Sequence, residues 1–126
     1  GYGRVDMNRV TLLGSETKLI DNKTGVALGE SKTVSASVGA SGKLRVTLSY
    51  TDAPASSGAA KALVNDIDVS VVGADGKVYD KKDRVNNTEM LELTGLKAGK
   101  YDVIVTGVIV PQGRAGKQPY ALAITQ

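Results

Sequence analysis

Hydrophobic residues recur at every second position over several short runs of this chain. Leu44, Val46 and Leu48 alternate with Arg45 and Thr47, for example. Side chains two residues apart point to the same face of a strand, so this period predicts β-strands with one buried face. Runs of this kind, together with short apolar runs of strand length, cover residues 34–38, 44–50, 63–72, 78–79, 90–93, 101–110 and 120–125.

Turn and loop signals separate these runs. Residues 74–77 and 97–100 are short glycine-containing segments that are typical of tight turns. Residues 51–61 and 111–119 are small and polar, which predicts longer surface loops. The spacing of the turns predicts an all-β fold of about eight strands, of the kind seen in β-sandwiches.

Residues 1–14 stand apart from the strand pattern. Val5, Val10 and Leu13 fit one short amphipathic helix that ends at Gly14. We therefore expect a helical lead-in over residues 1–14, followed by one β domain over residues 15–126. The chain opens on glycine rather than methionine, and we expect it to be a piece of a longer protein.

Two residue types are missing, which limits the chemistry. The 126 residues contain no histidine and no cysteine, so neither a Ser-His-Asp triad, nor a Cys-His pair, nor a disulfide can be built within them. Ser56, Ser57 and Lys61 are the parts of a serine–lysine nucleophile, but no element that would stabilise an oxyanion follows them. We expect this chain not to be an enzyme by itself.

Charge and hydropathy argue against two classes of partner. The net charge is +3, but the basic residues are scattered and only Lys81 and Lys82 stand out as an adjacent pair, so the basic stripe of a nucleic-acid interface is missing. Five tyrosines are the only aromatic residues, which leaves little for stacking bases or sugars. No apolar run approaches the ~20 residues of a membrane span. We expect neither nucleic acid nor a membrane as a partner.

The densest group of oxygen donors contains Asp66 and Asp68, which share the polar face of the run 63–72. Residues two apart in a strand are ~6.6 Å apart at their backbones, so both carboxylates can reach one hard cation such as calcium. Calcium takes about six to eight oxygen ligands, so others must converge on the pair. The alternative is that both aspartates only make an outer strand face soluble. The further candidate ligands are Asp52, Asp83, Asn86, Asn87 and Glu89.

Asn65 interrupts the apolar face that Leu63, Ile67 and Val69 form. A polar residue at such a position is either a ligand or loop clamp, or a buried amide that bonds backbone groups. Asn86 and Asn87 have two interpretations as well, because asparagine also tolerates the left-handed backbone of a turn.

Several segments occur in the order found in one protein family. Residues 1–6 (GYGRVD) resemble the G-x-G-x-V-(N/D) start of the last helix in a subtilisin-like catalytic domain. Residues 49–55 (SYTDAPA) and 63–69 (LVNDIDV) resemble the W-(S/T)-D-A-P-A and L-V-N-D-L-D-L stretches of the C-terminal jelly-roll domain in oxidatively stable alkaline proteases. The N-N-x-E, A-G-x-Y and V-P-x-G stretches of that domain have counterparts within residues 84–89, 98–101 and 110–113.

This resemblance covers nearly the whole chain and is more distantly shared with the P-domains of kexin-type convertases. Tyr50 departs from it, because the family usually has tryptophan there. The resemblance implies a jelly-roll β-sandwich that packs beside a protease domain, is secreted and binds calcium. Residues 1–14 would then be the tail of the upstream catalytic domain or a linker. The calcium role would pass to Asp66 and Asp68 first, then to Asp52, and then to Asp83, Asn87 and Glu89.

These observations predict a non-catalytic C-terminal accessory domain of a secreted subtilisin-like serine protease, which stabilises the parent enzyme and binds calcium. Its partner would be the catalytic domain of the parent, with the protein substrate as a second candidate. The main alternative is an extracellular binding or adhesion module for a polysaccharide or protein surface. A further alternative is an enzyme in which a carboxylate pair replaces histidine.

Overall fold

The computed structural model describes Arg4, Met7, Gly14 and residues 17–126. The helical lead-in expected over residues 1–14 therefore lies almost entirely outside the described residues. No helix among those described is long and apolar enough to cross a membrane. The described elements are the strands β1 (Lys18–Val26), β2 (Ser31–Val38), β3 (Leu44–Ser49), β4 (Asp66–Gly73), β5 (Val78–Asp80), β6 (Thr88–Leu93), β7 (Gly99–Ile109) and β8 (Gln118–Thr125).

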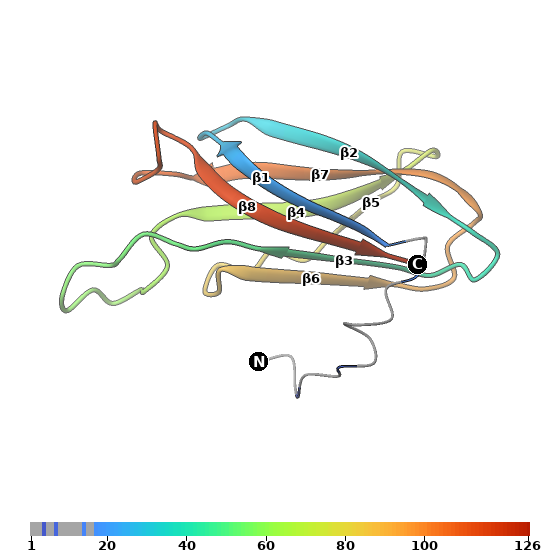
Figure 1. The fold of residues 1–126 in the computed structure, drawn as a ribbon, viewed down its shortest axis with the longest axis horizontal. Coiled ribbons are helices and arrows are strands. Elements are labelled where there is room, and N and C mark those ends of the chain that lie inside the picture. Colours follow the sequence, from blue (N-terminus) through green and yellow to red (C-terminus); the bar gives the residue numbers. More distant parts are fainter. Residues whose placement is uncertain (1–3, 5–6, 8–13, 15–16) are drawn as a thin grey trace.

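The strands form two antiparallel sheets of four strands each (Figure 1). The strand order is β1-β8-β3-β6 in one sheet and β2-β7-β4-β5 in the other. One hydrophobic cluster draws its residues from both sheets. The arrangement confirms the all-β class and the expected number of strands, and it is consistent with a β-sandwich.

The buried residues follow the alternation of the sequence. In β3, Leu44, Val46 and Leu48 are at most 1% exposed, and Val103 and Val105 of β7 are fully buried. Their neighbours on the other face are partly or fully exposed. Strands rich in aliphatic residues therefore fill the core from both sides, as the scarcity of aromatic residues predicts.

Strand β1 is the one that none of the runs predicted from the sequence covers. Its middle, Asp21 to Lys23, is polar and its register against β8 shifts between Asn22 and Val26. Gly25 lies in this irregular stretch with φ of +77°, and an added Cβ there would run into the backbone of Gln118. The irregularity returns Val26 to the core, where it is fully buried.

Strand β4 differs from the expectation at its start. Asp66 was expected on a polar outer face, opposite Asn65, but both residues are buried, with 1% and 0% exposure. The register of β4 against β7 shifts between Asp66 and Ile67. The unpaired residue, Val108, lies on β7, so the faces of β4 itself still alternate. Asp66 therefore shares a face with Asp68, as predicted, and both bond Arg84, but at Asp66 this face is buried rather than exposed.

Candidate functional site

The six residues to which the resemblance assigns the calcium role gather around the start of β4, where hydrogen bonds link them to one another or to common neighbours. They come from the β3–β4 connection, from β4, from the β5–β6 connection and from the start of β6. Most of them prove to bond backbone groups rather than one another. Each is described in turn.

The carboxylates of Asp66 and Asp68 share one cation, the guanidinium of Arg84. Its Nη1 donates to Asp66 Oδ2 at 2.7 Å and to Asp68 Oδ1 at 3.1 Å. The side chains of Asp66 and Asp68 are 2% and 13% exposed, against 42% for Arg84. The other oxygen of Asp66, Oδ1, is buried and has no hydrogen-bond partner among the described residues.

Burial and the charge of Arg84 have opposite effects on the aspartates. Burial raises the pKa of Asp68, and the positive charge of Arg84 opposes that rise. The hydrogen bond to Asp66 raises the pKa of Arg84 above its usual value. A buried carboxylate is costly unless a paired cation compensates the lost hydration. Arg84 supplies that compensation to both aspartates.

Glu89 connects β6 to two other segments. Its Oε2 accepts a 2.8 Å hydrogen bond from the backbone N–H of Val69, and its Oε1 accepts one of 2.8 Å from the N–H of Asp83. The residue is 2% exposed. Burial raises its pKa to about 7, although both backbone N–H groups act in the opposite direction. Glu89 therefore ties the β5–β6 connection to β4.

Asp52 closes the long loop between β3 and β4. Its Oδ1 accepts from the N–H groups of Ala53 and Asn65, both at 2.8 Å, and its Oδ2 accepts from Val64 at 2.7 Å. Ser56, Ser57 and Lys61, the parts of the serine–lysine nucleophile considered from sequence, lie exposed within this loop. The carboxylate thus holds the two ends of the loop together.

Asn65 is the centre of a buried amide network. Its Nδ2 donates to the carbonyl of Gln112 and, at 2.7 Å, to Oε1 of Gln118, while its Oδ1 accepts from the N–H of Gln112 at 3.1 Å. The Nε2 of Gln118 donates onward to the carbonyls of Thr51 and Pro119. Of the two interpretations that the sequence left open, these bonds favour a buried amide that also clamps a loop.

The β5–β6 connection is held by its own polar side chains. Asp83 Oδ1 accepts from the N–H groups of Val85 and Asn86, and its Oδ2 accepts from the Asn86 side chain. These bonds lower the pKa of Asp83. Asn87 donates instead to the carbonyl of Tyr50 at 2.7 Å. The two asparagines therefore organise a turn and a link between strands.

In this arrangement the six residues do not fit a calcium ion. Calcium requires about six converging oxygens, but no group of three acidic side chains among the described residues is placed to hold a metal ion. The Arg84 guanidinium already bonds both aspartates, and backbone N–H groups occupy oxygens of Asp52, Asp83 and Glu89. Calcium binding stays a prediction that the resemblance alone carries.

Sequence reasoning missed three residues of this network, namely Arg84, Tyr50 and Gln118. Arg84 stands in a charged, asparagine-rich segment where a solvated arginine is the default expectation. Its only sequence signal is its place two residues before the asparagine pair, within a segment already singled out for its resemblance. Tyr50 and Gln118 stand at strand ends, where the alternation of hydrophobic and polar residues does not indicate that a polar atom is buried.

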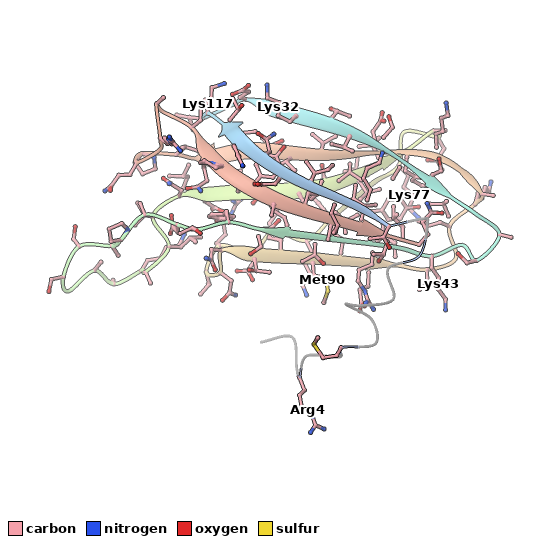
Figure 2. All side chains as sticks on the ribbon, in the orientation of Figure 1. Arg4, Lys32, Lys43, Lys77, Met90 and Lys117 are labelled. Atoms are coloured by element: carbon pink, nitrogen blue, oxygen red, sulfur yellow. The ribbon has the colours of Figure 1, made fainter. Side chains whose placement is uncertain are left out.

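A second polar cluster lies where Lys32 and Lys117 approach each other (Figure 2). Both bond Glu30, with Lys32 Nζ at 2.7 Å from Oε1 and Lys117 Nζ at 2.9 Å from Oε2. Oε2 also accepts from the N–H of Ala27. These contacts lower the pKa of Glu30 to about 2. The cluster ties the β1–β2 connection to the start of β8 and leaves no free group of a catalytic kind.

Comparison with known proteins identifies no relative. No family model matches the chain, and no curated protein matches it.

Proposed function

We propose that this chain is a non-catalytic accessory domain of a secreted subtilisin-like serine protease, that its sandwich has jelly-roll topology, and that it stabilises the parent enzyme by packing against the catalytic domain. The family assignment rests on the ordered motifs of the sequence. The strand pairing is the argument for the topology, and the hydrogen bonds among the resembling segments are the argument for the structural role.

The strand pairing supports the jelly roll. A jelly roll is an antiparallel ribbon of eight strands folded over into two sheets, so its first strand pairs with its last and the pairing continues inward. The pairs β1–β8, β2–β7, β3–β6 and β4–β5 are all present. The pairs β1–β8 and β3–β6 lie in one sheet, and the pairs β2–β7 and β4–β5 lie in the other, so successive pairs alternate between the two sheets.

One observation carries the proposed role: the segments that resemble the protease family bond to one another. Asp52 bonds the N–H of Asn65, Tyr50 bonds the Asn65 carbonyl, Asn87 bonds the Tyr50 carbonyl, and Gln112 bonds the Asn65 amide. These residues come from four of the resembling segments, which are far apart in sequence. Residues that meet in this way specify how loops attach to the sandwich.

The partners of these side chains favour stabilisation over catalysis. The carboxylates of Asp52, Asp83 and Glu89 accept hydrogen bonds from backbone N–H groups. Carboxylates used in this way order loops and remove unsatisfied buried donors. A catalytic carboxylate has to face a substrate instead. The arrangement therefore supports a rigid domain whose loop end is locked.

The test begins with the coding sequence on the 5′ side of the codon for Gly1, which is expected to encode a subtilisin-like catalytic domain. That protease is then produced with and without residues 15–126, and its thermal inactivation is followed with a small peptide substrate. We expect the truncated enzyme to keep its kcat/KM at low temperature and to lose activity about tenfold faster on heating. An upstream sequence without a protease, or equal rates of inactivation, would contradict the proposal.

A further inference from the structure

The resemblance implies a calcium ion between Asp66 and Asp68, but the residues found there do not fit one. The position between the two carboxylates belongs to Arg84, whose Nη1 lies within hydrogen-bond distance of both. We infer that Arg84 is the built-in counter-ion of this acidic pair, so that the pair needs no divalent cation and the β5–β6 connection is fastened to β4 by the protein itself.

The burial of Asp66 makes the arginine necessary. Its side chain is 2% exposed, and its Oδ1 has no hydrogen-bond partner among the described residues. Arg84 donates the hydrogen bond that Oδ2 receives. If Arg84 is removed, a buried carboxylate is left without a compensating charge, and this is the most damaging way to break an ion pair.

The neighbours of Arg84 fix the chain on both sides of it. Asp83, directly before it, accepts from Val85 and Asn86 and donates its N–H to Glu89. Asn87 is fixed to Tyr50 by its side chain and by its carbonyl, which accepts from the Tyr50 N–H. A side chain positioned by its neighbours loses less entropy when it forms a bond than a free surface arginine does. The ion pair therefore differs from an ordinary exposed one, although Arg84 itself is 42% exposed.

A double-mutant cycle on the chain of residues 1–126 tests this assignment. The variants are Arg84→Gln, Asp66→Asn and the combination of the two, with Lys81→Gln as a control that removes a neighbouring positive charge from the same connection. We expect Arg84→Gln to lower the Tm by about 5 °C or more and Lys81→Gln to change it little. In the Asp66→Asn background, Arg84→Gln should lower the Tm by less than half as much, because only the more exposed Asp68 then loses its partner. Equal losses in both backgrounds would overturn the assignment.

A second measurement is made first on the wild-type chain, and so remains available if the Arg84 or Asp66 variants do not fold. The Tm is recorded in excess EDTA, in CaCl₂ and in NaCl at matched ionic strength. We expect three equal values, since the cation of the pair is covalently part of the chain. A Tm that rises in CaCl₂, with the rise abolished by Asp68→Asn, would place a metal at the pair and overturn the inference. Neither outcome bears on whether the domain belongs to a protease, which the truncation experiment decides separately.

Discussion

The phenolic hydroxyl of Tyr50 donates a 2.9 Å hydrogen bond to the backbone carbonyl of Asn65. The two residues enclose the long β3–β4 connection, and they are 5% and 0% exposed. Burial raises the pKa of Tyr50, so the hydroxyl remains a donor throughout the neutral range. This bond joins the end of β3 to the approach to β4 inside the protein, beneath an exposed loop.

Replacing Tyr50 with phenylalanine tests the contribution of that bond. The ring keeps its packing, but the Asn65 carbonyl loses a donor in a buried position. We expect a loss of about 1–2 kcal/mol in the free energy of unfolding, measured by urea denaturation. Tyr79→Phe is the matched control, because this tyrosine is only partly buried and sits on the short strand β5. Equal effects of the two substitutions would show that the hydroxyl of Tyr50 has no special role.

The second prediction concerns Asp52, which accepts three backbone hydrogen bonds at the ends of the loop. Asp52→Ala removes all three acceptor contacts. We expect a loss of about 2–4 kcal/mol in stability and faster cleavage between residues 53 and 63 in limited proteolysis, because the loop ends are released. Asp21→Ala, at a surface ion pair with Lys23, should leave both measurements nearly unchanged. An unaltered cleavage rate in Asp52→Ala would contradict the clamp.

The third prediction is that Glu89 makes the stability of the fold depend on pH. Its pKa is about 7 in the folded protein against an ordinary value of 4.5 for glutamate, so the folded state binds the proton more tightly than the unfolded state. Its contribution to stability is therefore full below about pH 4.5 and declines as the pH rises to about 7. We expect a decline on the order of 2 kcal/mol across this window. The chain has no histidine, so no histidine titration is superimposed on it.

Urea midpoints measured from pH 4.5 to pH 8 give this profile directly. Glu89→Gln is the comparison, since it cannot ionise although it also loses one of two acceptor oxygens. The variant is expected to be less stable than wild type at the acidic end and to show a flatter profile. Parallel profiles for the two proteins would assign the dependence to other carboxylates.

The part of the fold that the sequence predicts is the part that simple alternation governs. Strands β3, β7 and β8 bury every second residue, and the core residues Val46, Val103 and Leu122 follow from that period alone. The turn at residues 74–77 also appears, closed by the hydrogen bond from Gly76 N–H to the Gly73 carbonyl. Local rules are sufficient where each strand has one buried and one outer face.

The site could not be predicted to the same extent, because it depends on which part of a polar strand face is buried. Asp66 lies on the same face as Asp68, as the period predicts, but it is buried there. The partner of the buried Asp66 depends on tertiary structure, because Arg84 lies 18 residues away in the sequence. The sequence indicated which oxygen donors are close together, but it did not indicate that a guanidinium, rather than a metal ion, would lie between two of them.

The central claim, that this domain stabilises a protease by packing against it, is tested most directly by differential scanning calorimetry of the parent protein. Intact parent, isolated catalytic domain and isolated residues 15–126 are heated under the same conditions with the protease inhibited. We expect one cooperative transition for the intact protein, at a higher temperature than the isolated catalytic domain shows. Two separate transitions at the temperatures of the isolated parts would contradict it.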